Sequence, residues 1–312
     1  NNSNSWDVPD VDYNTIMIGD DAGSQAEDAS HVIMLGEIAG SHSKTNTGTV
    51  MIGFSAGLYA ENSFDTVMIG RGAGHNSTGC YYDNMIGPNA GLSASQNQNT
   101  NMIGDNAGAA SSRVKYSDLI GYYAGEQSHG VEYSQLMGEN VGQKLKMTAN
   151  TLAVGKQTLQ TASGLYSWVA IGERAGAASV GFTSTGMAWS DIGYDGDSPD
   201  HVNEGNITTS QSKYVVAIGN LAGANSLNTQ SSINIGQKAG QINRNSYQTI
   251  AIGTHAGRFR DGSVSNIYIG YNAGLGQDAG LMLPLGIGVN QVFIGSAKSG
   301  GGSASGPGRI CD

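Results

Sequence analysis

The sequence is poor in charged residues, which form only 13% of the chain, and acidic residues dominate among them. There are 15 Lys and Arg against 25 Asp and Glu, giving a net charge of −10. Nucleic acids and anionic membrane surfaces attract clustered Lys and Arg, so this balance disfavours both as partners. We therefore predict no nucleic-acid binding and no membrane insertion, whereas neutral glycans or basic protein patches are easier partners.

Cysteine and long apolar runs are also scarce. The two cysteines, Cys80 and Cys311, lie far apart, so neither a disulfide framework nor a zinc site is expected. No apolar run approaches the roughly 18 residues of a membrane span, and no signal-peptide pattern opens the chain. The first residue is Asn, which favours a fragment or a processed product.

Glycine, in contrast, is abundant at 48 of 312 residues and follows a strict period. The phrase Ile-Gly-x-x-Ala-Gly recurs in steps of 17 residues. Its first glycine falls at Gly19, Gly36, Gly53, Gly70, Gly87, Gly104, Gly121, Gly138, Gly155 and Gly172, then at Gly219, Gly236, Gly253 and Gly270, with looser copies at Gly193 and Gly295. A fixed period of this size indicates stacked copies of one small unit.

Each repeat predicts a short strand that ends at glycine. Its plainest form is Thr-Val-Met-Ile-Gly, in which β-branched residues favour a strand and glycine allows a corner. The Ala three residues later fits a narrow interior, and the remaining nine or ten polar residues predict a surface arc. A helix is disfavoured because each of the two glycines would cost about 1 kcal/mol. The predicted fold is all-β, an elongated parallel β-solenoid or β-helix.

The interior of such a coil is thin, because it holds only three or four apolar side chains. A core shared between chains would stabilise it, so we expect a parallel homotrimeric fibre. The period alone leaves open whether each chain coils on itself or three chains wind around one another. The same period explains the serine-hydrolase-like phrase Gly53-Phe54-Ser55-Ala56-Gly57 as a coincidence of the repeat, since neighbouring copies carry Asp21 or Ile38 at the Ser position.

The repeat divides the chain into four segments. We predict a regular array over residues 1–172, interrupted repeats with insertion loops over 173–218, and a second regular block over 219–274. A C-terminal tip with a Gly/Ser-rich end follows over 275–312. Its apolar run Leu281–Leu285 is interpreted as part of a trimer core.

The strand phrases Tyr214–Gly219 and Thr249–Gly253 resemble the repeat of trimeric autotransporter heads of the YadA type. The terminal phrase Gly308–Asp312 resembles the junction at which a self-cleaving intramolecular chaperone leaves certain bacteriophage fibres. The chain is thus similar to the C-terminal part of an L-shaped siphophage tail fibre, with Asp312 as the implied C-terminal processing site. That resemblance implies a virion location and binding of host-surface polysaccharide of the lipopolysaccharide O-antigen type.

Interruptions of a repeat array emerge as loops and often carry the binding site. Aromatic rings stack on sugars and carboxylates accept bonds from sugar hydroxyls, so a glycan site is predicted around the interruption. Its candidate residues are Trp168, Phe182, Trp189, Tyr194, Asp195, Asp197, Asp200 and His201. The alternative interpretation is that Trp168 and Trp189, each four residues before a repeat glycine, fill the coil interior.

The predicted function is multivalent, non-covalent adhesion to a host polysaccharide, with no catalytic residue, metal or cofactor. One alternative is a polysaccharide-degrading tailspike that uses the acidic residues of segment 182–204 as its paired carboxylates. The other alternative is the head of a bacterial trimeric adhesin. Calcium binding by the same acidic residues is a weaker hypothesis, since their spacing is not that of an EF-hand loop.

Overall fold

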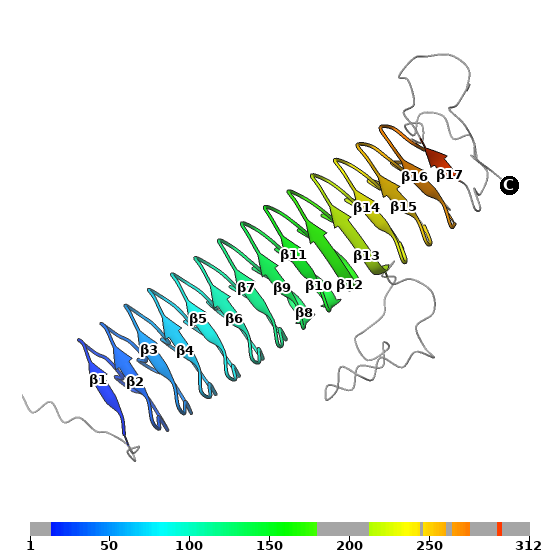
Figure 1. The fold of residues 1–312 in the computed structure, drawn as a ribbon. Helices are drawn as coiled ribbons and strands as arrows, with labels where there is room; N and C mark the ends of the chain where they lie inside the picture. The colour runs from blue at the N-terminus through cyan, green and yellow to red at the C-terminus, as the bar shows by residue number, and fades with distance from the viewer. Residues whose placement is uncertain (1–13, 180–211, 244–245, 260–263, 275–291, 295–312) are drawn as a thin grey trace, which may run out of the picture. The chain divides into compact units, whose positions relative to one another are not determined.

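The computed structural model describes residues 14–179, 212–243, 246–259, 264–274 and 292–294 (Figure 1). These residues contain parallel strands and turns but no helix, which confirms the all-β, parallel β-solenoid prediction. The chain divides into two compact units, Asn1–Leu145 and Lys146–Asp312, which are described separately.

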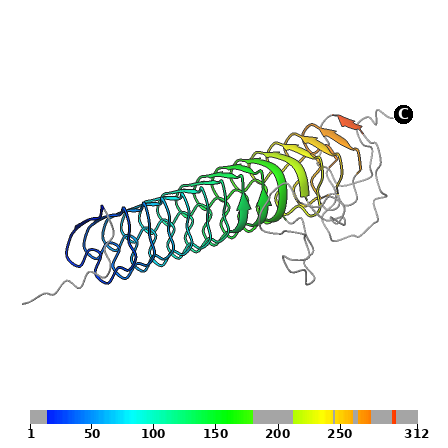
Figure 2. The same cartoon turned by 90° about the horizontal axis from the view of Figure 1, so that it is seen from below.

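Unit 1 contains one three-residue strand on the same side of each coil, eight in all, and a further short strand, β8, on a neighbouring side of its last coil. The strands are β1 (Ile16–Ile18), β2 (Ile33–Leu35), β3 (Val50–Ile52), β4 (Val67–Ile69), β5 (Asn84–Ile86), β6 (Asn101–Ile103), β7 (Asp118–Ile120), β8 (His129–Glu132) and β9 (Gln135–Met137). Neighbours pair in parallel and in register, so that Val50 lies beside Val67 and Met51 beside Met68. Each repeat is therefore one coil of a single chain, which answers the question that the period alone left open: the chain coils on itself. Figure 2 shows these coils as successive turns of a tube.

Unit 2 continues the same repeat. Its strands are β10 (Lys146–Ala149), β11 (Leu152–Val154), β12 (Ser163–Ile171), β13 (Ser212–Ile218), β14 (Ile233–Ile235), β15 (Ile250–Ile252), β16 (Ile267–Ile269) and β17 (Val292–Ile294). β12 pairs directly with β13, with Val169 beside Val216. These two strands are therefore neighbours in the stack, and the looser copy at Gly193 lies outside the described residues. β17 pairs with β16, which confirms the copy before Gly295.

The interior holds the central residue of the three-residue strands that have a strand on both sides, whereas Met17 in β1, the first strand, is 43% exposed. In unit 1 these residues are fully buried: Met34, Met51, Met68, Met85, Met102, Leu119 and Leu136. The repeat alanines, such as Ala39 and Ala56, are also fully buried, which confirms the narrow interior. The second glycine of each repeat leaves space for the methionine, because a Cβ on Gly40 would lie 2.5 Å from the Sδ atom of Met34.

The polar arc is only partly a surface feature, and here the sequence interpretation was wrong. Residues seven, ten and thirteen positions after the repeat glycine turn inward, as Ser43, Asn46 and Thr49 do with no exposed surface. Asn46 donates to the carbonyl of Ala60 at 3.1 Å and accepts from the amide of Ser63 at 3.0 Å. Small polar side chains fit this side of the interior because backbone groups of the adjacent coil satisfy many of their hydrogen bonds.

Candidate functional site

Most of the predicted glycan site cannot be placed. Phe182, Trp189, Tyr194, Asp195, Asp197, Asp200 and His201 lie outside the described residues, as does the predicted processing site Asp312. Trp168 lies in β12, where it is fully buried. A Cβ on Gly176 would lie 3.0 Å from its ring, so the ring fills the coil interior. Trp168 therefore presents no ring face to a sugar, and we no longer count it among the glycan-site residues.

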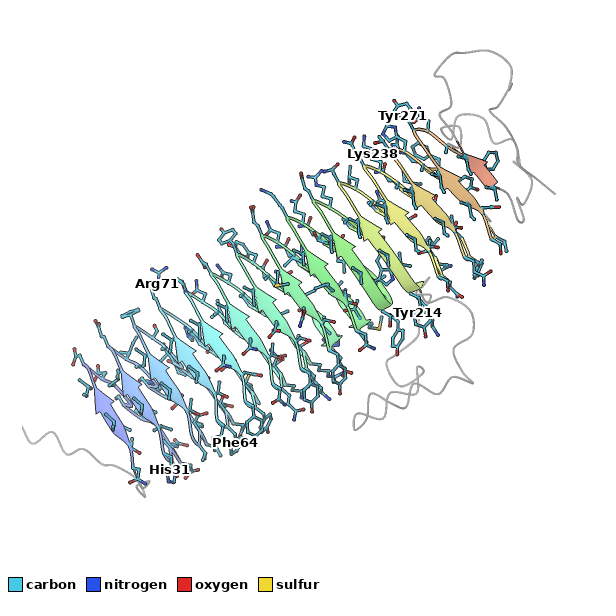
Figure 3. All side chains as sticks on the ribbon, in the orientation of Figure 1. His31, Phe64, Arg71, Tyr214, Lys238 and Tyr271 are labelled. Carbon is cyan, nitrogen blue, oxygen red and sulfur yellow. The ribbon has the colours of Figure 1, made fainter. Side chains whose placement is uncertain are left out.

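The structure instead gathers aromatic side chains along one edge of unit 1. We call Phe64, Tyr81, Tyr82, Tyr116 and Tyr133 the aromatic corner. The four tyrosines are exposed by 39%, 55%, 45% and 41%, in that order. Phe64 and His31 mark this edge in Figure 3, and Arg71 lies on the opposite edge of the unit. The coils thus hold several large rings in contact with solvent on one side.

Backbone geometry fixes where these rings point. Tyr82, Tyr116 and Tyr133 have left-handed φ angles of 58°, 50° and 48°, which turn the chain at the corner and direct the side chains outward. The amide of Tyr82 donates to the carbonyl of Phe64 at 2.9 Å, one coil away. The amide of Tyr116 bonds to Gln98 in the same manner at 2.9 Å. The rings are therefore carried on a hydrogen-bonded frame rather than on a free loop.

The rings form two stacked pairs with a polar stretch between them. The Phe64 and Tyr81 ring centroids are 5.3 Å apart with planes at 2°. Tyr116 and Tyr133 stack at 5.0 Å and 8°. Aromatic pairs at this spacing stabilise each other by about 0.5–1.5 kcal/mol beyond area burial, so each pair is a firm apolar platform.

Asn99 lies between Tyr82, which belongs to neither pair, and Tyr116, the first ring of the second pair. It lies one coil from Tyr82 and one coil from Tyr116, in the row that these tyrosines occupy. At about 4.8 Å between neighbouring strands, the two tyrosine positions are about 10 Å apart. A ring bound above Asn99 would lie about 5 Å from each tyrosine position, within the range at which rings stack. Asn99 is exposed there, so its side-chain amide can form a hydrogen bond with a hydroxyl group.

Polar groups surround the platforms without a strong charge of either sign. Asp65 precedes Tyr82 in one row, and Gln98 and Lys115 follow Tyr81 in the neighbouring row of bridged residues. Together they offer a carboxylate acceptor, an amide and an ammonium donor within one or two coils of the rings. A few polar groups beside an apolar ring face are what the recognition of an uncharged, hydroxyl-rich ligand requires.

Two ionisable residues lie in the interior beneath the corner. Cys80 is a buried free thiol, and its burial raises its pKa. Burial also raises the pKa of Asp83 to about 7, although hydrogen bonds from the amide of Thr100 and the thiol of Cys80 act in the opposite direction. Neither group reaches the surface, so they belong to the frame of the corner and not to its binding face.

Other exposed aromatic residues form smaller groups. In unit 1, Tyr59 is 47% exposed, and its ring centroid lies 4.9 Å from that of His42 and 6.1 Å from that of His75. Tyr122, on the edge of unit 1 that carries Arg71, is 49% exposed and contacts Tyr123 edge-on at 4.3 Å. In unit 2, Tyr214 and Tyr271 are exposed by 59% and 53% on opposite edges (Figure 3). None of these residues belongs to a set of stacked rings as dense as the aromatic corner.

Features of some other functional classes are absent from the described part of the chain. These residues contain no group of three His, Cys, Asp or Glu side chains arranged to hold a metal ion. They also contain no helix long and apolar enough to cross a membrane. No protein-family model matches the chain, and no curated protein sequence matches it.

The aromatic corner was missed in the sequence, although a signal for it is present. Phe64 and Tyr81 are one period apart, and so are Tyr116 and Tyr133. Writing the sequence in rows of one period would have aligned them. The glycan site was predicted at the interruptions of the repeat instead, because insertions in a repeat array often carry binding sites.

Proposed function

We propose that this chain is a receptor-binding segment of an extracellular fibre that holds a host-surface polysaccharide without cleaving it. The observation that carries the proposal is the aromatic corner: two pairs of stacked rings, all exposed except the half-buried Phe64, with hydrogen-bonding side chains between the pairs. Ring faces that alternate with amide and carboxylate groups suit a chain of sugar units. The proposed setting is a phage tail fibre of the O-antigen-binding type, located on the virion.

The rigid backbone that holds the aromatic corner suits adhesion better than cleavage of the polysaccharide. Each ring is fixed by backbone bonds to neighbouring coils, so binding costs little ordering of the protein. The contact with a single sugar is weak. Three copies of the site in a homotrimer would raise the overall affinity, because once one site is bound the others meet the polysaccharide at a high effective concentration. In this proposal the fibre is a homotrimer, and many weak sites provide its affinity for the cell.

The proposal is tested by binding to a panel of purified O-antigen polysaccharides, measured by surface plasmon resonance with the wild-type chain and two alanine variants. Tyr116→Ala removes a ring of the corner, and Tyr122→Ala removes an equally exposed ring from the opposite edge of unit 1. We expect Tyr116→Ala to weaken binding roughly tenfold and Tyr122→Ala to leave it unchanged. Equal effects of the two changes would reject the aromatic corner as the binding face.

The absence of cleavage is tested on the same polysaccharides. After prolonged incubation with the protein, their length distribution is followed by gel electrophoresis. Unchanged lengths support adhesion alone. Shortened chains would replace the proposal with a polysaccharide-degrading tailspike.

A further inference from the structure

Unit 1 has an apolar row on the outer face of its strands. The last residue of each three-residue strand points outward and is never polar; we call these residues the isoleucine row. They are Ile18, Leu35, Ile52, Ile69, Ile86, Ile103, Ile120 and Met137. In the middle of the unit Ile86, Ile103 and Ile120 remain 36%, 37% and 36% exposed, although each packs beside its neighbours along the row. A contiguous apolar surface of this kind marks an interaction site.

The first residue of the same strands forms a second row beside it, the flanking row. This row is apolar at Ile16, Ile33, Val50 and Val67, and then polar at Asn84, Asn101, Asp118 and Gln135. The polar part is bonded within its own chain: Asn84 donates to Asn101 at 2.7 Å, and Asn101 donates to Asp118 at 2.6 Å. The isoleucine row stays apolar along the whole of unit 1, whereas the flanking row changes from apolar to polar. The flanking row is therefore compatible with solvent in its polar half, and the isoleucine row is apolar throughout.

Unit 2 repeats the isoleucine row. The equivalent residues are Val154, Ile171, Ile218, Ile235, Ile252, Ile269 and Ile294, again without a polar member. Ile171, Ile252 and Ile269 are each 36% exposed. The strict apolar character therefore holds in both units, although the rest of the surface is rich in polar residues.

We infer that the isoleucine row is the interface between parallel, in-register copies of this same chain, with the row lying along their symmetry axis. The spacing of the row indicates that the partner is a second copy of this chain. Its side chains repeat once per coil, about every 4.8 Å, and a second copy of the chain presents the same spacing at every level. A globular partner or a lipid surface has no such period.

The flanking row disfavours an antiparallel arrangement. Rotation about an axis along the isoleucine row places the flanking rows of parallel copies on opposite sides of that axis, so no flanking row is laid against another one. An antiparallel arrangement of unit 1 would place Asn84, Asn101 and Asp118 beside isoleucine and valine, and would leave their amides or carboxylate against an apolar surface. The register of the parallel copies follows from symmetry, because copies related by rotation alone place equivalent coils at the same level, whereas a shift along the axis would leave the assembly unclosed.

Each unit offers a strip of useful area. Eight strands at about 4.8 Å and three residues at about 3.3 Å give unit 1 a strip of about 400 Å². The seven equivalent strands of unit 2 give a strip of about 350 Å² by the same spacing. Each strip is about half of the roughly 800 Å² that a partner contributes to a stable interface, so loss of apolar contact in one unit should weaken assembly measurably.

The inference specifies the surface of the proposed homotrimer and is independent of what the aromatic corner binds. It is tested by the mass in solution of the full chain, measured by light scattering after size exclusion. The wild-type protein is expected at a multiple of 32.1 kDa. Ile103→Lys, which places a charge in the row, is expected to raise the concentration needed for assembly at least tenfold. The matched control Gln96→Lys, at an exposed corner away from the strands, should assemble like the wild type.

A cross-linking experiment tests the register and does not depend on the folding of the lysine variant. Ile52→Cys and Ile103→Cys are each made in a Cys311→Ser background, with tags of different size. In-register parallel copies predict a disulfide-linked dimer of each variant alone and no mixed dimer when the two are co-expressed. A wild-type mass of 32.1 kDa, efficient mixed cross-linking, or equal assembly of Ile103→Lys and Gln96→Lys would overturn the inference. Loss of glycan binding would not affect any of these results.

Discussion

Gly70 offers the sharpest test of how the coils stack. It has a φ angle of +133°, and a Cβ at this position would lie 2.5 Å from the carbonyl oxygen of Gly87 and 2.7 Å from its carbonyl carbon. Both atoms belong to the backbone of the next coil, so no side-chain rotation can relieve the contact. Gly70→Ala must therefore push two coils apart.

The cost of Gly70→Ala follows from that displacement. The amide of Gly87 donates to the carbonyl of Ile69 at 2.8 Å, and separating the coils enough to admit a methyl group would stretch this bond. The unfavourable φ angle costs about 1–3 kcal/mol, and each weakened hydrogen bond costs about 1 kcal/mol. The free energy of unfolding of unit 1 should fall by about 3–5 kcal/mol.

Gly79 is the matched control, on an adjacent corner of the same unit. Its φ angle is +63°, and a Cβ there would meet nothing closer than 3.9 Å. Gly79→Ala should cost only the left-handed conformation, about 1–2 kcal/mol. Equilibrium unfolding in guanidinium chloride, followed by far-ultraviolet circular dichroism, compares the two variants with the wild type. Equal shifts of the two midpoints, or no shift for Gly70→Ala, would refute the close backbone approach.

Three further predictions concern the interior and the corners of unit 1. Asp83 is protonated in the folded state up to its raised pKa of about 7 and ionises near 3.8 when unfolded. The free energy of unfolding that neutral Asp83 supports is therefore complete below about pH 4 and falls by about 4 kcal/mol between pH 4 and 7. Asp83→Asn should remove this pH dependence of the denaturant midpoint, measured from pH 4 to 8. An unchanged pH dependence would contradict the assignment to Asp83. In a Cys311→Ser background, Cys80 should react with Ellman's reagent only on unfolding, because burial raises its pKa and blocks access; rapid reaction of the native protein would show that the interior is open. Ile38 has a φ angle of 51°, which is unfavourable for a β-branched residue; Ile38→Asn should raise the free energy of unfolding by about 1 kcal/mol, and a lower midpoint in thermal denaturation would show that packing of the isoleucine outweighs its backbone strain.

The strands and the narrow interior could be predicted because their residues recur in nearly every copy, with exceptions such as Val141 and Thr158 at the Ala position. A Gly at each coil corner and an Ala three residues later leave few alternatives to a stacked β-coil. The inward polar residues could not be predicted in the same way. Thr49 and Asn46 have the composition of a surface arc, and only the adjacent coil provides the backbone partners that make their burial possible.

The candidate site was predicted less well than the fold. Trp168 was placed in the glycan site by its residue type, but its position in the coil directs it inward, where Gly176 leaves room for its ring. The aromatic corner depends on residues that only stacking brings together, as with Tyr116 and Tyr133. Residue type indicates what a side chain can bind, whereas its place in the period determines whether it reaches solvent.

The fixed offset between paired strands also limits how such a chain can change in length. Gain or loss of one whole coil within unit 1 leaves the inward row and the isoleucine row in step, so Met stays beside Met and Ile beside Ile, as in the pairing of β3 with β4. Loss of a single residue would instead rotate the next inward side chains toward solvent. Unequal recombination between repeats could therefore lengthen or shorten the array in whole coils while the packing of each coil is inherited intact.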